Sequence, residues 1–153
     1  MGAGAKARLL FGAAMSVSTK GQYALQALFD LASQNTDEPV KIASIAERQK
    51  IPQKFLGLVL SSLREGGFVE SRRGADGGYC LARLPETITV GQVLRCIEGP
   101  AQKKRALKCE TPFGEVWRRV DRSVAEIVER ADLASIARDW AEKRRAHTYD
   151  WEI

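Results

Sequence analysis

The sequence is poor in the residues that most catalytic and metal-binding sites require. Its 153 residues include one histidine, His147, and three cysteines at wide, irregular spacing. No nucleophile–base spacing and no glycine-rich phosphate loop occurs, so an enzyme is not expected. No apolar run approaches the length of a transmembrane helix, and an odd cysteine count without a disulfide framework fits a reducing cytosol. These absences favour a cytoplasmic protein that is neither an enzyme nor a membrane protein.

The composition is that of a globular chain with excess positive charge. Hydrophobic residues make up 44% and charged residues 28%, which is ordinary for a folded domain. The net charge of +5 suits a polyanionic partner, although basic solvated surfaces are also common. The length accommodates one domain of ordinary size and an appended helix.

Residues 40–81 contain two short helical patterns joined by a turn. Pro52 suits the first turn of the second helix, and the glycines at 66–67 suit its end. This layout predicts a helix-turn-helix. Apolar residues recur at helical spacing, as Ile42, Ile45 and Ala46 in the first helix and Leu56, Val59, Leu60 and Leu63 in the second.

A basic hairpin follows the second helix. Residues 68–73 show a strand pattern, 74–78 a glycine-rich turn and 79–81 a return strand. A helix-turn-helix followed by such a hairpin predicts a winged helix, in a fold that is mainly α with a small β-wing, and its expected partner is double-stranded DNA. Strand alternation points Arg72 and Arg73 to opposite faces, so one of them should face DNA, unless the hairpin tip is simply solvated.

Several separate motifs also match a known family in the same order. They are 18–24 (STKGQYA), 45–49 (IAERQ), 73–74 with 77–79, and 88–91 with 98–100. On these motifs, the run 18–100 resembles the Rrf-type family of winged-helix bacterial transcription regulators. The resemblance implies a dimeric DNA-binding repressor or activator. It also selects Arg73, beside Gly74, as the wing residue that faces DNA, where an arginine can enter a narrow minor groove.

Further DNA contacts are expected from two helices. A helix should begin at Thr19, with Thr19 and Gln22 as a capping box. Lys20 at its start either binds a phosphate together with free backbone N–H groups or is solvated, and the resemblance favours the phosphate. In the second helix of the motif, Gln53 and Lys54 are expected base readers.

The outward face of that second helix carries Lys54, Gly57, Leu58 and Ser61. Leu58 either touches a thymine methyl group or packs against Phe55. Gly57 weakens the helix by roughly 1 kcal/mol relative to alanine, but its missing side chain would let the helix lie close to the bases. Family members often carry polar residues at these two positions, so the operator sequence does not follow from the resemblance. The full expected interface is Thr19, Lys20, Tyr23, Gln53, Lys54, Phe55, Leu58, Ser61, Arg72, Arg73 and Gly74.

A coiled-coil seam marks the C-terminal third of the chain. Its apolar positions alternate steps of four and three residues: Phe113, Trp117, Val120, Val124, Ile127 and Ala131. The helix should partly fold back on its own domain and mainly pair with a second copy. Asp132 can cap a final helix, which we expect to pack on the first helix of the chain. The predicted layout is a disordered extension (1–14), a winged helix-turn-helix domain (15–100), a connector (101–112), and the dimerisation and C-terminal helices (113–153).

Three functions fit these features. The favoured function is that of a homodimeric transcription regulator, more a repressor than an activator. It should bind a pseudo-palindromic operator and hold no metal or other cofactor. Its effector is unknown. Cluster-binding relatives place three cysteines together in the connector, whereas this connector holds only Cys109. A cluster, or a redox-sensing thiol at Cys109 beside Lys108, is the second interpretation. The third is a protein–protein module that binds a metabolic enzyme.

Overall fold

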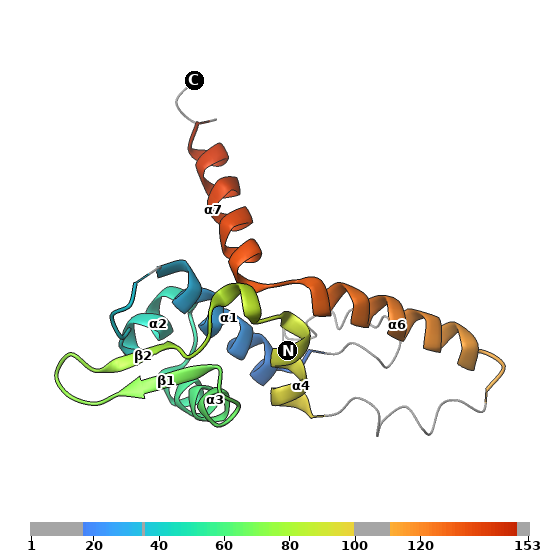
Figure 1. Cartoon of the computed structure of the whole chain (residues 1–153), viewed down its shortest axis with the longest axis horizontal. Coiled ribbons are helices and arrows are strands. Elements are labelled where there is room, and N and C mark those ends of the chain that lie inside the picture. The colour runs from blue at the N-terminus through green and yellow to red at the C-terminus, as the bar shows by residue number, and fades with distance from the viewer. Residues whose placement is uncertain (1–16, 35, 100–110, 150–153) are drawn as a thin grey trace, which may run out of the picture.

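The computed structural model describes residues 17–34, 36–99 and 111–149. Within these ranges the chain forms six α-helices, one 3-10 turn and a two-stranded sheet (Figure 1). The predicted class, mainly α with a small β-wing, is confirmed. The expected disordered extension (1–14) and Cys109 lie outside the described residues. In chain order the elements are α1 (Thr19–Gln34), α2 (Ile42–Gln49), α3 (Gln53–Glu65), β1 (Val69–Arg72), β2 (Gly78–Leu81), η1 (Pro85–Thr87), α4 (Val90–Glu98), α6 (Gly114–Arg130) and α7 (Leu133–Tyr149).

Helix α1 lies at the centre of the body and packs against α2, α3, α4, β2 and α7. Its buried side chains include Ala24, Ala27, Leu28 and Leu31, and Leu25 and Ala32 are half-buried and pack against them. A helix surrounded by five elements buries more than one stripe, and periodicity cannot choose between them. The core comprises Ala24, Ala27, Leu28, Leu31, Ile45, Ile51, Leu56, Val59, Leu60, Leu63, Phe68, Val69, Ile88, Val93 and Leu133.

Side-chain caps define three helix starts. Helix α1 begins at Thr19 as expected, but Ser18 is the cap, because its Oγ accepts a 3.0 Å hydrogen bond from the Gly21 N–H. The cap therefore lies one residue before the expected Thr19, and Gly21, three residues beyond Ser18, has no side chain that could complete a capping box. Thr89 and Gln92 form a complete capping box at α4. Asp132 caps α7 by accepting a 2.9 Å hydrogen bond from the Ser135 N–H.

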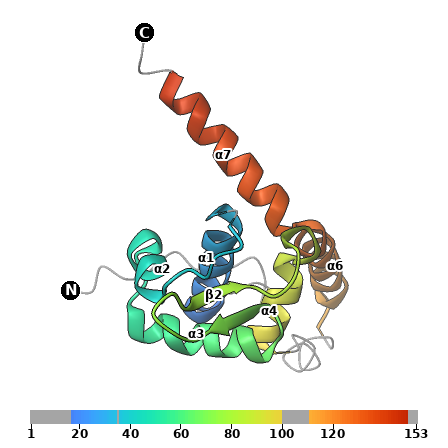
Figure 2. The same ribbon diagram turned by 60° about the vertical axis from the view of Figure 1, so that its left-hand side comes forward.

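Helices α6 and α7 leave the body in different directions (Figures 1 and 2). The first turn of α7 is anchored by the buried Leu133, and the helix packs on α1, as predicted, and on η1. Helix α6 packs on α4, where Gly91 gives room to Glu129 and Arg95 pairs with Glu129. Among the described residues, no helix combines the length and apolar character that crossing a membrane requires.

Candidate nucleic-acid interface

A buried carboxylate fixes α2 against α1. The side chain of Asp30 in α1 is almost fully buried and accepts hydrogen bonds from Arg48 Nε at 2.9 Å and Arg48 Nη2 at 2.7 Å. Gln49 Nε2 donates a third bond at 3.0 Å. The hydrogen bond to Asp30 raises the pKa of the Arg48 guanidinium. Sequence reasoning missed this network, although an aspartate between Phe29 and Leu31 in an apolar helix was a visible signal.

The turn between α2 and α3 is tight because one residue adopts a left-handed conformation. Lys50 has φ 56° and directly follows α2. Ile51 is buried, and its N–H donates to the Ala46 carbonyl at 3.0 Å. Pro52 then starts the next helix, as its carbonyl accepts from the Leu56 N–H. The predicted helix-turn-helix is thus present, and its turn sets the direction of α3.

Helix α3 buries one side and exposes the other. Its buried positions, Leu56, Val59, Leu60 and Leu63, are those predicted from the sequence. Gln53 and Lys54 are exposed in its first turn, and Ser61 is half-buried. Phe55 and Leu58 are 60% and 65% exposed, so neither belongs to the core. The structure therefore brings all the predicted contact residues of α3 to its outward side or its flanks.

The wing is a short hairpin extended by a third segment. Strand β1 pairs with β2 in antiparallel register, Val69 opposite Leu81 and Arg72 opposite Gly78. Val40, before α2, exchanges two 2.8 Å backbone hydrogen bonds with Tyr79 and so ties the hairpin to the helix-turn-helix.

Glycines allow the hairpin to close tightly. A side chain at Gly77 would strike the Arg72 carbonyl, and one at Gly78 would strike the Val40 carbonyl. Gly74 has φ 109°, a conformation that L side chains rarely adopt. Arg72 ends β1 and Arg73 follows it, both exposed to solvent.

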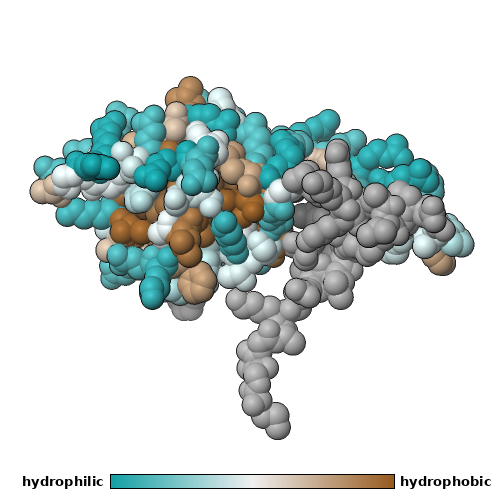
Figure 3. Space-filling model, turned by 90° about the horizontal axis from the view of Figure 1, so that it is seen from below, coloured by the Kyte–Doolittle hydropathy of each residue, from teal (hydrophilic) through white to brown (hydrophobic). Residues whose placement is uncertain are grey.

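The first turn of α1 provides the remaining predicted contacts. Thr19 and Lys20 are exposed, whereas Tyr23 is half-buried and packs against the core. The N-terminal end of α1 and the whole of α3 lie towards the lower side of the body (Figure 1). Seen from that side, the body presents apolar patches among hydrophilic ones (Figure 3).

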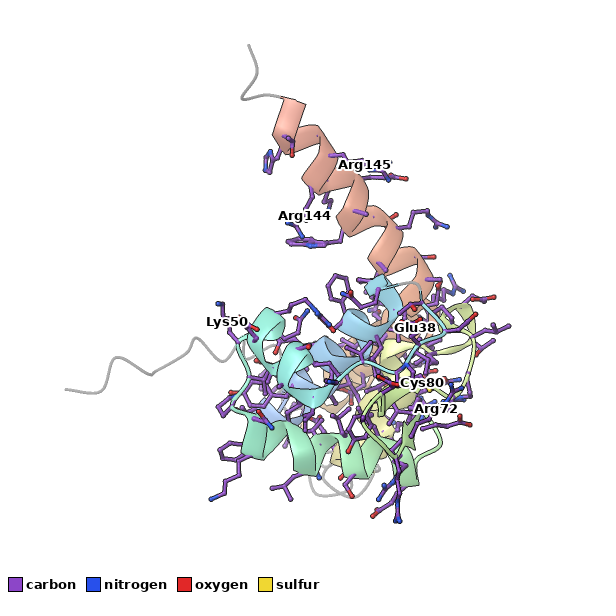
Figure 4. All side chains as sticks on the ribbon, turned by 90° about the vertical axis from the view of Figure 1, so that its left-hand side faces the viewer. Glu38, Lys50, Arg72, Cys80, Arg144 and Arg145 are labelled. Carbon is purple, nitrogen blue, oxygen red and sulfur yellow. The ribbon has the colours of Figure 1, made fainter. Side chains whose placement is uncertain are left out.

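The labelled side chains show how charge is distributed. Arg72 lies on the wing, and Lys50 projects from the helix-turn-helix at the other side of the body (Figure 4). Arg144 and Arg145 point to opposite sides of α7, above the body and away from α3. Arg144 and Arg145 are therefore not part of the surface formed by α3 and the wing.

The described cysteines do not converge. Cys80 is half-buried on β2, and Cys96 on α4 is exposed. The Cys96 thiol lies 4.0 Å from the Ser62 carbonyl oxygen. Within the described part of the chain, no group of three or more histidine, cysteine, aspartate or glutamate side chains could hold a metal ion.

A winged helix-turn-helix with this layout matches known proteins over most of its length. The model of the Rrf2 family, described as iron-dependent transcriptional regulators, matches residues 17–139. The chain belongs to the Rrf2 family. The transcriptional regulator CymR of Bacillus subtilis is 36% identical over 124 residues, covering 80% of this chain and 90% of the relative. The regulator IscR of Erwinia tasmaniensis is 31% identical over 132 residues, covering 80% of this chain and 78% of the relative.

Solved structures of Rrf2-family members support the same family assignment. The structure of B. subtilis CymR, titled the global cysteine regulator, has a TM-score of 0.74 at 35% identity and covers 80% of this chain and 96% of its own. T. potens IscR has a TM-score of 0.72 at 41% identity, with 84% and 90% covered. The resemblance found in the sequence motifs is confirmed, and the protein is a DNA-binding transcription regulator.

Proposed function

We propose that the protein is a homodimeric repressor that binds a pseudo-palindromic operator in the cytoplasm without an iron–sulfur cluster. The observation that carries the proposal is the outward side of α3, where Gln53 and Lys54 are exposed in the first turn beside an exposed wing. A helix of this kind enters the major groove with its N-terminal residues near the bases. Residues 15–100 form the DNA-binding unit, and 113–153 form the dimerisation unit.

The proposed contacts divide into base readers and phosphate or groove contacts. Gln53 can pair with adenine and Lys54 with guanine, and Ser61 can donate to a phosphate. Lys20 and the free N–H groups of the first turn of α1 bind another phosphate, next to Thr19 and Tyr23. From the wing, Arg73 enters the minor groove, with Arg72 and Gly74 beside it.

The proposed dimer is supported by large apolar side chains on and next to α6 that the single chain leaves exposed. Phe113, Trp117 and Ile127 expose large apolar side chains there, and Val116, absent from the predicted seam, does so too. Val120, Val124 and Ala131 are half-buried within the single chain. Pairing of two such helices about a two-fold axis would cover this surface and place two α3 helices on one duplex.

The positions of the two described cysteines support the proposal that the protein holds no cluster. Cys80 on β2 and Cys96 on α4 belong to different elements, and only Cys109 remains for a site in the connector. A cluster needs several thiolates that converge on its irons. Protein purified without oxygen should be colourless and free of stoichiometric iron and sulfide; a visible absorption band with both would overturn this part.

The main test is selection of DNA from the organism's own genome. Fragments retained by the purified protein should share a pseudo-palindromic sequence whose half-sites lie one helical turn, or a multiple of it, apart. Transcription in vitro from a promoter that contains such a site should fall when the protein is added. Retention of fragments with no shared sequence would contradict a specific operator, and increased transcription would make the protein an activator.

A further inference from the structure

The middle of the recognition helix exposes apolar side chains that the fold does not use. Leu58 is 65% exposed and Phe55 is 60% exposed, and both lie outside the buried core. They are one helical turn apart on the same side of α3, so together they form one apolar surface. Lys54 adjoins this surface and is also exposed. An apolar surface flanked by positive charge suits a partner that combines apolar groups with phosphates.

Packing within the chain does not explain why position 57, beside this surface, is a glycine. A Cβ atom added there would meet only Ile42 Cδ1, at an ordinary contact distance of 3.8 Å. By contrast, a Cβ at Gly21 or Gly91 would collide with the side chains of Glu98 or Glu129. Alanine would favour the helix at a position that accepts it. Packing within the described chain therefore gives no reason for glycine at 57, whereas close approach of a ligand to the backbone would give one.

We propose that α3 reads thymine through its 5-methyl groups, with Leu58 and Phe55 in contact with the methyls and Gly57 letting the helix lie deep in the major groove. The proposal rests on operator binding as proposed above. Thymine is the base that presents an apolar group at the major-groove edge, and aliphatic and aromatic side chains recognise it by contact. Since neither position 57 nor 58 can hydrogen-bond through a side chain, this part of the operator is read by shape and apolar contact.

Substitution of uracil for thymine tests the proposal on the unaltered protein. Uracil keeps every hydrogen-bonding atom of thymine and lacks only the 5-methyl group. The selected operator, with deoxyuridine at each thymine in turn, should bind about fourfold more weakly per contacted methyl, which corresponds to the ~0.8 kcal/mol of burying one such group. Substitution in both half-sites should give roughly the square of that factor.

Variants assign the effect to residues. Leu58→Ala should bind the thymine operator more weakly and lose the preference for thymine over uracil at the bases that Leu58 contacts. Leu84→Ala is the matched control, because Leu84 is also 65% exposed but lies next to η1, which packs on α7. This control should keep both the affinity and the thymine preference. A thymine preference that survives Leu58→Ala and Phe55→Ala would overturn the assignment.

Gly57→Ala separates binding from folding. The variant should melt at the same temperature as the parent or higher, yet bind the operator more weakly. Unchanged operator affinity in Gly57→Ala would remove the close approach from the proposal.

The outcomes distinguish failure of this inference from failure of the operator itself. A protein that selects a specific operator but binds its uracil form equally well would refute thymine reading alone. A protein that selects no operator refutes the proposed function first. Binding of another protein in place of DNA, lost in Leu58→Ala, would show that the apolar surface serves a protein partner and would overturn both.

Discussion

At the scale of single residues, the two members of the Asp30–Arg48 pair are in unequal surroundings. The Asp30 side chain is 2% exposed, whereas that of Arg48 is 39% exposed. Arg48 left alone could be hydrated, but Asp30 left alone would be a buried charge whose remaining hydrogen-bond donor among the described side chains is Gln49. Removing one partner of a buried pair is costly chiefly through the charge that stays buried.

Arg48→Leu should therefore destabilise the protein more than Asp30→Asn. We expect losses of about 3 kcal/mol for the first and about 1–2 kcal/mol for the second, which keeps a hydrogen-bonding group. Urea unfolding followed by circular dichroism measures both. The double variant should lose less than the sum of the two, because the charge left by Arg48→Leu is gone. Strict additivity would show that the pair does not act as a unit.

Asp132 gives a pH dependence whose sign follows from its hydrogen bonds. The backbone N–H and the hydroxyl of Ser135 donate to its carboxylate and lower its pKa below the ordinary value. Its stabilising effect should be complete above the ordinary carboxyl pKa, about 3.9, and should be lost as the pH falls through the lower pKa of the folded state.

Asp132→Ala should reduce stability by about 1 kcal/mol at neutral pH, as expected for loss of a helix cap. The difference from wild type in urea unfolding should stay constant down to about pH 5 and shrink below that. A difference that grows as the pH falls would contradict the proposed role of the ionised carboxylate.

At the scale of elements, the helix-turn-helix and wing were predictable because each rests on local signals. The apolar spacing of Leu56 to Leu63 and the glycines after it mark α3 directly. Contacts between distant segments were not predictable: the bridge from Val40 to Tyr79 depends on the folded hairpin. The sequence did not predict the Asp30 network or the Ser18 cap for a related reason. Several residues could fill each role, and only the packing of α1 selects among them.

The exposed arginines make the wing a testable element. Arg73→Ala should weaken operator binding and, if Arg73 contacts a phosphate, lower the slope of log affinity against log salt by about one unit. If Arg73 enters the minor groove, the loss should be about 1–3 kcal/mol and largest at A·T-rich sites. Arg144→Ala removes the same charge from α7, away from α3, and serves as control. Equal affinities for both variants at low and high salt would exclude the wing from binding.

At the scale of the whole molecule, α6 packs on α4 but leaves large apolar side chains exposed. Phe113, Val116, Trp117 and Ile127 are all more than two-fifths exposed in the single chain. The sequence predicted the seam from its spacing, but spacing could not show which positions α4 would partly cover. Val120, Val124 and Ala131 are the half-buried ones. The remaining exposed surface is what the proposed dimer would bury.

Ile127→Glu is the sharpest test of that dimer. Ile127 is 69% exposed, so a carboxylate there is solvated in a monomer and leaves its fold intact. In a symmetric pair of seams the same carboxylate would be buried beside apolar side chains, which is strongly unfavourable. Ala125→Glu, on an exposed position of α6 outside the seam, adds the same charge as a control. Sedimentation at micromolar concentration should show dimers for wild type and Ala125→Glu and monomers for Ile127→Glu. In DNA binding, Ile127→Glu should bind a single half-site no more tightly than wild type does. It should also lose the preference for two half-sites at fixed spacing. A dimer that persists in Ile127→Glu would place the interface elsewhere on the protein.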